Sequence, residues 1–293
     1  MIKIKTQVGI IGAGPAGLTL AHWLKKNGIS SVIIELRSRE YVEGRVRAGL
    51  LEQNTVDIIN DMGLGERMQK EGITHDGVYL SFDQERIHVP FAELTGGRQI
   101  TIYGQQEVVK DLTDAWLEDG QQLYFEAGAT KITNFDTDNP QIHFTQNGEE
   151  GIISCDFVAA CDGFHGIGRK TMPKESYQSY DITYPFSWLG ILANVAPSTD
   201  ELIYAYHENG FALHSLRSET VSRLYLQVDN DENMENWPDE RIWEELSVRL
   251  GTEGWNLKSG PIFDKSITPM RSHMIDNLQY GRLFLAGDAG DIV

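Results

Sequence analysis

The chain has 293 residues, of which 41% are hydrophobic, and it carries a formal net charge of -18. At roughly 150 residues per domain, this length predicts about two domains with a sizeable core. The excess of carboxylates excludes binding to nucleic acid or to anionic membranes through a large basic surface, because the acidic protein and these polyanions repel each other. Any anionic ligand must therefore be bound by locally placed arginines.

The chain contains only two cysteines, Cys155 and Cys161. Two are too few for a disulfide framework, and their spacing lacks the further Cys or His partners of a zinc site. We therefore predict two buried thiols in a reducing compartment and no metal site. The N-terminus carries no export signal, and no apolar run reaches the ~20 residues of a spanning helix. A cytoplasmic location without membrane or nucleic-acid partners is expected.

The first 35 residues predict a strand, a glycine-rich turn, a helix and a second strand that ends in Glu35. In the turn, Gly12, Gly14 and Gly17 match the pattern G-x-G-x-x-G. That pattern needs glycine for a tight turn, close approach of a pyrophosphate and close packing of the helix. Because strand, helix and downstream acid all agree, we predict a dinucleotide site in which Glu35 meets a ribose hydroxyl. A merely structural turn is the alternative.

The rest of the chain divides into two regions that differ in their predicted secondary structure. A helical stripe at 108–116 and a buried strand at 157–160 continue the first region. From about 175 to 270, strands rich in aromatic and β-branched residues are predicted at 187–195, 202–206, 211–217 and 222–228. A helix between Pro238 and Gly251 follows, and 283–286 predicts a strand that returns to the first region.

Polar and aromatic side chains converge on one face of the second region. At period two, the strand 211–217 presents Ser215 and Arg217 together, while its neighbours present Tyr225 and Tyr204. A buried arginine needs an anionic partner, and its fork of donors suits a carboxylate. These residues predict a pocket for an aromatic acid. In the alternative interpretation, Arg217 pairs with an internal Asp or Glu and the tyrosines are ordinary sheet residues.

Three segments occur in an order and spacing that resemble the single-component flavoprotein aromatic hydroxylases. They are residues 12–17 with Glu35, residues 161–166 with Arg169, and residues 281–288. The resemblance implies an α/β fold (α+β overall), a Rossmann-like FAD-binding domain of the GR2 type with an inserted mixed and antiparallel substrate sheet. The FAD domain would comprise 1–74, 101–174 and 273–293, and the substrate domain 75–100 and 175–272.

Residues 41–49, 51–53, 103–105, 184–190 and 201–205 narrow the resemblance to members of this family that hydroxylate 4-hydroxybenzoate. It implies that FAD is bound by Gly12, Gly14, Gly17, Glu35, Arg45, Arg47, Gln105, Asp162 and Asp288. For NADPH it implies Arg37, Tyr41, Arg45, His165 and Arg271. Because Leu36 replaces a polar residue expected to select NADPH, NADH is the alternative. Ser215, Arg217 and Tyr225 would bind the substrate carboxylate, and Tyr204 the phenol oxygen.

The function implied is hydroxylation of 4-hydroxybenzoate to 3,4-dihydroxybenzoate with NADPH and O2 through a flavin C4a-hydroperoxide, in aromatic-compound degradation. The catalytic residue Tyr204 would favour the phenolate. The resemblance also suggests a homodimer.

Two departures from the family leave other functions open. The chain ends at Val293, about a quarter earlier than relatives, and Gly290-Asp291 stands where they carry Ala-His. A second hypothesis is therefore an FAD-binding fragment without turnover. A third is a hydroxylase of another phenolic acid. An NAD dehydrogenase would leave the segments at Asp162 and Asp288 unexplained.

Overall fold

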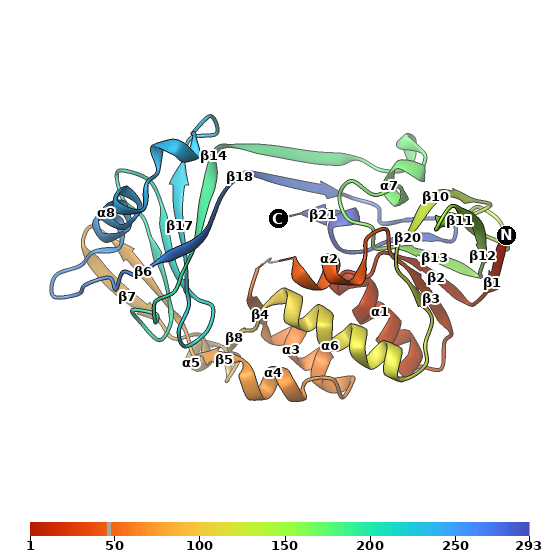
Figure 1. The fold of residues 1–293 in the computed structure, drawn as a ribbon, viewed down its shortest axis with the longest axis horizontal. Helices are drawn as coiled ribbons and strands as arrows, with labels where there is room; N and C mark the ends of the chain where they lie inside the picture. Colours follow the sequence, from red (N-terminus) through yellow and green to blue (C-terminus); the bar gives the residue numbers. More distant parts are fainter. Residues whose placement is uncertain (46–47, 293) are drawn as a thin grey trace.

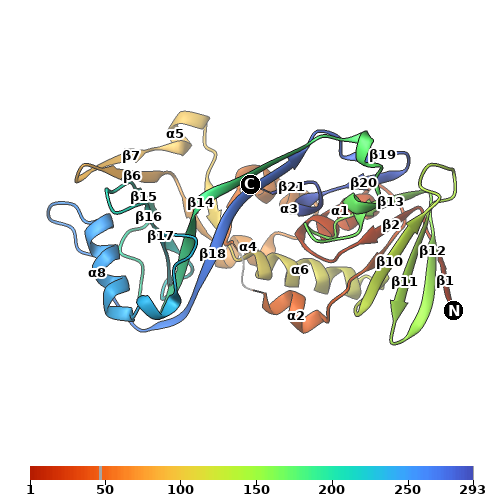
Figure 2. The same ribbon diagram turned by 90° about the horizontal axis from the view of Figure 1, so that it is seen from above.

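The computed structural model describes residues 1–45 and 48–292 of the chain. Its elements form an elongated molecule with a nucleotide-type sheet at one end and a large eight-stranded sheet at the other (Figure 1). Two long strands, β14 (Ser179–Ala193) and β18 (Ile262–Ile275), pair with each other and run between the two ends (Figure 2).

The six-stranded sheet has the order β19-β20-β13-β2-β3-β9 and is parallel except for the edge pair β19·β20. Its strands are Gln279–Tyr280 (β19), Leu283–Leu285 (β20), Phe157–Ala160 (β13), Val8–Ile11 (β2), Ser31–Ile34 (β3) and Leu123–Tyr124 (β9). The predicted strand-helix-strand unit is confirmed, because α1 (Pro15–Lys26) connects β2 to β3. The carboxyl ends of β20, β13, β2 and β3 therefore meet at one edge of the sheet.

Both faces of this sheet are covered. On one face, Ile10 and Ile33 pack with Leu18 of α1 and with Leu112 and Trp116 of α6 (Gln105–Glu118). On the other face lies a four-stranded sheet, β1-β12-β11-β10. Its strands are Ile2–Lys5 (β1), Glu149–Ser154 (β12), Gln141–Gln146 (β11) and Ala127–Thr133 (β10). Burial on both faces explains why the strands β2 and β3 read as continuous apolar runs.

The eight-stranded sheet has the order β21-β18-β14-β17-β16-β15-β6-β7, and its only parallel pair is β15·β6 within the part of the chain that the structure describes. The strands not yet named are Asp291–Ile292 (β21), Ser222–Val228 (β17), Ala212–Leu216 (β16), Leu202–Ala205 (β15), Val78–Phe82 (β6) and Glu85–Val89 (β7). Helix α8 (Asp239–Leu250) packs its apolar stripe, including Ile242 and Leu246, against one face. Part of the other face packs against Leu50, Ile73 and Ile102, and side chains of the candidate site lie on the same face.

A small sheet, β4-β8-β5, and short helices connect the two ends. Its strands are Leu50–Glu52 (β4), Ile100–Ile102 (β8) and Ile73–His75 (β5). The remaining helices are α2 (Arg39–Gly44), α3 (Gln53–Asp61), α4 (Glu66–Glu71), α5 (Phe91–Thr95) and α7 (Gly168–Thr171). Helix α6 begins directly after β8, so its first turn lies where the two regions meet.

The predictions about the cysteines can be compared directly with the structure. Cys155 and Cys161 are both free and buried, as expected. Burial raises the pKa of Cys155 to about 11 and that of Cys161 to about 12, which makes both thiols poor nucleophiles. Among the helices of the described residues, none is long and apolar enough to cross a membrane.

Candidate functional site

The three sequence segments that predicted the nucleotide site lie side by side in the fold. Backbone hydrogen bonds at the strand ends join them: Gly12 N to Ile34 O at 2.8 Å, Cys161 N to Ile11 O at 2.8 Å, and Ala286 N to Ala160 O at 3.1 Å. The segments that follow β2, β13 and β20 are thus neighbours along one sheet edge. This edge is where open α/β sheets bind ligands.

The three positions of the turn are occupied by glycine for different steric reasons. Gly12 has φ +103°, and a Cβ there would lie 2.3 Å from the carbonyl oxygen of Cys161. A Cβ at Gly17 would lie 2.0 Å from the carbonyl oxygen of Gly12. At Gly14 a Cβ would meet nothing within 4 Å, so this position faces open space. Gly14 also begins α1 without a side-chain cap, which leaves the first amides of the helix to an anion. The turn therefore fits a pyrophosphate.

The carboxylate of Glu35 braces the glycine turn from the end of β3. It accepts hydrogen bonds from the backbone N–H of Ala13 at 2.9 Å and of Arg37 at 2.8 Å. Both bonds hold the carboxylate at the sheet edge where a ribose would lie. Each carboxylate oxygen keeps a further lone pair, with which it could accept a hydrogen bond from a ribose hydroxyl.

Asp162 and Asp288 differ in their surroundings. The Asp162 carboxylate accepts from Gly168 N at 2.9 Å, and burial raises its pKa. The bond to Gly168 N holds the loop after β13, while Oδ1 of Asp162 is buried without a hydrogen-bond partner among the described residues. Asp288 is exposed in the turn Gly287–Ala289, next to α1, because a Cβ at Gly287 would lie 2.9 Å from Cβ of Ala16. Of these two carboxylates, that of Asp288 is the more exposed at this edge.

Two of the remaining candidates for FAD, Gln105 and Arg45, lie at the beginning of α6 and at the end of α2. Gln105 is the first residue of α6, and its backbone N–H donates to Ala48 O at 3.0 Å. Arg45 is exposed directly after α2. Arg47, also predicted from the resemblance, lies outside the described residues.

The candidates for the reduced nicotinamide cofactor form two separate groups. Arg271 stacks its guanidinium 3.8 Å from the ring centroid of Phe164, and His165 contacts the same ring edge-on at 5.0 Å. The structure thus brings together Arg271 and His165, from β18 and from the loop after β13. Arg37 and Tyr41 form the second group, with the guanidinium 5.2 Å from the ring centroid. Stacked guanidinium groups keep their donors available to phosphate.

The predicted substrate residues share one face of the eight-stranded sheet, opposite α8. Tyr204 pairs with Leu213 across β15·β16, and Leu213 pairs with Tyr225 across β16·β17, which places the three side chains in one row. Ser215 and Arg217 follow Leu213 at period two. Burial raises the pKa of Tyr204, so its phenol stays protonated and can donate a hydrogen bond.

Two further aromatic rings complete this face: Phe211, which period two places with Ser215 and Arg217, and Trp188, to which the sequence interpretation gave no role in the pocket. The ring of Phe211 lies 5.2 Å from Trp188 and 6.1 Å from Tyr204, and Trp188 lies 6.0 Å from Tyr225. Period two along β14 is the signal that places Trp188 here, because Gly190, two residues further on, pairs with Tyr225. The face therefore runs from an aromatic surface around Tyr204 to a cation at Arg217, which suits an aromatic acid.

The guanidinium of Arg217 lies where the β16–β17 hairpin meets the start of α6. Its Nη2 donates to Oε1 of Gln106 at 2.6 Å, and its Nη1 is buried without a hydrogen-bond partner among the described residues. Burial, and then the nearby Arg223, lowers the pKa of Arg217, although a guanidinium remains charged. No ion pair of Arg217 with an Asp or Glu is found in residues 1–45 and 48–292, which disfavours the alternative of internal pairing.

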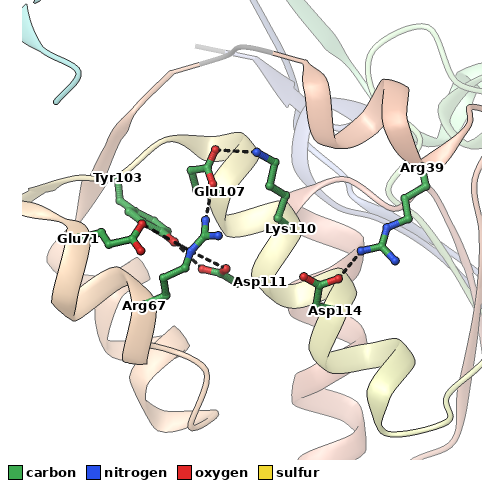
Figure 3. Close-up of polar contacts among 8 residues, drawn as sticks. All are labelled: Arg39, Arg67, Glu71, Tyr103, Glu107, Lys110, Asp111 and Asp114. Atoms are coloured by element: carbon green, nitrogen blue, oxygen red, sulfur yellow. Dashed lines mark hydrogen bonds and ion pairs between the residues drawn. The ribbon is translucent and has the colours of Figure 1, made fainter. Parts of the chain in front are cut away.

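A polar network on α6 fixes the helix whose first turn carries Gln105 and Gln106 (Figure 3). The hydroxyl of Tyr103 accepts from Arg67 Nε at 2.6 Å and donates to Asp111 at 2.6 Å. Arg67 also pairs with Glu107, which accepts from Lys110 at 2.9 Å. The network ties α4 and the end of β8 to α6, and it thereby sets the position of the first turn.

The fold and the sheet edge are those of a dinucleotide-binding protein, and comparison with known proteins shows that it is an FAD-dependent monooxygenase. Residues 5–293 match the protein family described as FAD binding domain, and the chain belongs to this family. It is 45% identical over 294 residues to p-hydroxybenzoate hydroxylase of Acinetobacter baylyi, an alignment that covers 100% of this chain and 72% of that protein. Phenol 2-monooxygenase of a Pseudomonas species is 32% identical over 73 residues, 25% of this chain and 12% of its own.

Solved structures share the fold at low sequence identity. p-Nitrophenol 4-monooxygenase PnpA of Pseudomonas putida superimposes with a TM-score of 0.84 at 18% identity, over 99% of this chain and 74% of that one. OxyS anhydrotetracycline hydroxylase of Streptomyces rimosus gives 0.70 at 21% identity, over 99% and 57%. These structures confirm the predicted fold class, while the family match and the 45% identical relative confirm the FAD cofactor and the monooxygenase class.

Proposed function

We propose that this monooxygenase hydroxylates 4-hydroxybenzoate to 3,4-dihydroxybenzoate with NADPH and O2. The observation that carries the proposal is the face of the large sheet, which has a cation with an unpaired, buried donor at one end and a protonated phenol at the other. The identity of 45% to a p-hydroxybenzoate hydroxylase supports the same substrate. On this proposal the aromatic acid binds to 75–100 and 175–272, and the cofactors bind to 1–74, 101–174 and 273–293.

Each substrate residue has a distinct task on this proposal. Arg217, with Ser215 and Tyr225, binds the carboxylate and so orients the ring. Tyr204 donates a hydrogen bond to the phenol oxygen of the substrate, stabilises the phenolate and passes the proton toward solvent. Because a phenolate is more nucleophilic than a phenol, the adjacent ring carbon becomes the site of attack. FAD, when bound and reduced, supplies the activated oxygen.

The glycine turn, Glu35, Gln105 and Asp288 would hold FAD, with Arg45, Arg47 and Asp162 as further contacts. For NADPH, His165 and Arg271, which both contact the ring of Phe164, would bind phosphate. Arg37, Tyr41 and Arg45 would contribute further contacts from a separate group. A homodimer belongs to the same proposal, and light scattering of the purified chain tests it. NADPH and NADH can be compared in the assay below.

The test begins with purified chain, added FAD, NADPH and 4-hydroxybenzoate, followed by absorbance and by chromatography of the products. We expect substrate to accelerate NADPH oxidation and 3,4-dihydroxybenzoate to accumulate. Bound flavin without product would favour a non-catalytic FAD-binding fragment or another phenolic acid as substrate.

The role of Tyr204 is tested by Tyr204→Phe, which removes only the hydroxyl. We expect the yield of product per NADPH oxidised to fall at least about tenfold, while the dissociation constant of 4-hydroxybenzoate changes less than about threefold. Tyr206→Phe is the matched control, because Tyr206 is 72% exposed and lies two residues away. Unchanged product yield in Tyr204→Phe would refute the assigned role.

A further inference from the structure

The guanidinium of Arg217 is held by parts of the chain that are distant in sequence. The amide oxygen of Gln106, 111 positions away, accepts from Nη2 at 2.6 Å. Two glycines make room on either side. A Cβ at Gly49 would lie 2.4 Å from Nη1, and one at Gly104 would lie 2.9 Å from Nη2. The guanidinium is therefore fixed against backbone and against one neutral side chain.

The chemistry of the partner determines what Arg217 can still bind. An amide oxygen satisfies one nitrogen of the guanidinium and leaves its charge uncompensated, whereas a carboxylate in the same place would neutralise it. Nη1 remains buried and without a hydrogen-bond partner in the part of the chain that the structure describes. A buried, charged donor without a partner is costly, and a ligand carboxylate would satisfy it.

We propose that Gln106 is a positioning residue for the substrate: its neutral amide holds one nitrogen of Arg217 so that the charged group is presented to a carboxylate. The inference rests on the proposed role of Arg217 and adds a residue that sets selectivity for acids over neutral analogues. Gln106 follows Gln105, a candidate contact of FAD, in the first turn of α6. The same turn would thus place the flavin contact and the substrate cation relative to each other.

The test is Gln106→Glu, which keeps the size and the acceptor but adds a charge. Binding of 4-hydroxybenzoate and of its uncharged isostere, 4-hydroxybenzamide, is measured calorimetrically on the full chain without turnover. In Gln106→Glu the introduced carboxylate pairs with Arg217 and competes with the ligand. We expect affinity for the benzoate to fall about 10- to 100-fold and affinity for the benzamide to change less than about threefold.

Three variants make the result decisive. Gln69→Glu adds the same charge at an exposed position of α4 and should alter neither affinity. Gln106→Met removes the acceptor without adding charge, and should weaken benzoate binding about fivefold by releasing the guanidinium. If Gln106→Glu does not fold, as judged by circular dichroism, Gln106→Met carries the test. Arg217→Met should abolish the preference for the benzoate.

The outcomes separate the two proposals. A parent chain that binds both ligands equally, or an Arg217→Met variant that keeps the preference, overturns the proposed role of Arg217 and the inference with it. A preference that depends on Arg217 but is unchanged in Gln106→Glu overturns the inference alone. Equal losses for both ligands in Gln106→Glu would show a merely structural role for Gln106.

Discussion

The two proposed sites of this enzyme differ in how they are built. The nucleotide edge lies at the carboxyl ends of β2, β3, β13 and β20, and the substrate face carries Tyr204, Ser215 and Arg217. At the nucleotide edge, the backbone and glycines make the site: Gly12 and Gly17 have no room for a Cβ, and Gly14 faces open space. On the substrate face, side chains make the site, and they come from β14, β15, β16, β17 and the start of α6. The glycine turn and Glu35 of the first site lie within one short segment, whereas the second site is assembled from several distant ones.

This difference determines how each site tolerates change. A backbone turn cannot yield to an added atom, because its neighbours are main-chain carbonyls. A side chain on a sheet face can be exchanged while the strands remain paired, so substitutions there change the ligand rather than the fold. Atoms added where the glycine turn has no room should therefore lower stability, whereas substitutions on the substrate face should lower selectivity.

The largest effect should come from Gly12→Ala. The residue has φ +103°, and the new Cβ would lie 2.3 Å from the carbonyl oxygen of Cys161. We expect the free energy of unfolding, measured with urea, to fall by about 4 kcal/mol from backbone strain and overpacking together.

Gly14→Ala is the matched control for this change. Gly14 has φ -78° and nothing within 4 Å of a Cβ, so stability should stay within about 0.5 kcal/mol of the parent. FAD affinity should nevertheless fall about tenfold or more, because the methyl group occupies the space of the pyrophosphate. Equal stability losses in the two variants would contradict the backbone explanation of this turn.

The second prediction concerns the buried side of the large sheet, where His214 lies in β16. Burial, and then the nearby Arg86, lowers the pKa of His214 to about 4. An unfolded histidine titrates near ~6.5, so stability is complete above that pH and falls as the pH decreases toward the folded value. Between these limits the loss should be about 3 kcal/mol.

Urea unfolding at pH 7 and at pH 4.5 tests this prediction in the parent and in His214→Gln. Neutral His214 accepts a hydrogen bond from Ser198 N at 3.0 Å, which glutamine can replace only in part, so the variant starts less stable at pH 7. Its further loss on acidification should be smaller by about 2 kcal/mol. The raised pKa of Asp162 acts in both proteins and cancels in the comparison. Parallel losses in parent and variant would exclude His214 as the cause.

The same contrast explains what could be predicted from the sequence. Gly12, Gly14, Gly17 and Glu35 follow one another within 24 residues, so local pattern sufficed for the nucleotide edge. Ser215 and Arg217 could be placed on one face because strands alternate. Gln106 could not be found in this way, because its contact with Arg217 depends on tertiary folding across 111 positions. The bond from Gly168 N to Asp162 could not be predicted from the motif either, because it depends on the loop conformation after β13.

The smallest effect should come from Tyr103→Phe, at the junction of the two regions. Its hydroxyl links Arg67 to Asp111, and both burial and the bond to Asp111 raise its pKa. We expect a loss of about 1 kcal/mol in unfolding free energy, because Arg67 Nε still lies 3.0 Å from Asp111 Oδ1 (Figure 3).

Ligand binding then shows whether this network serves both sites. The first turn of α6 carries Gln105 and Gln106. Loosening this turn should therefore lower the affinities for FAD and for 4-hydroxybenzoate by the same small factor, about two- to threefold. Gly14→Ala should weaken only the binding of FAD, and Gln106→Glu should weaken only the binding of the benzoate. If Tyr103→Phe affected only one ligand, the network would position only that ligand's contact residue, and the junction would not couple the two regions.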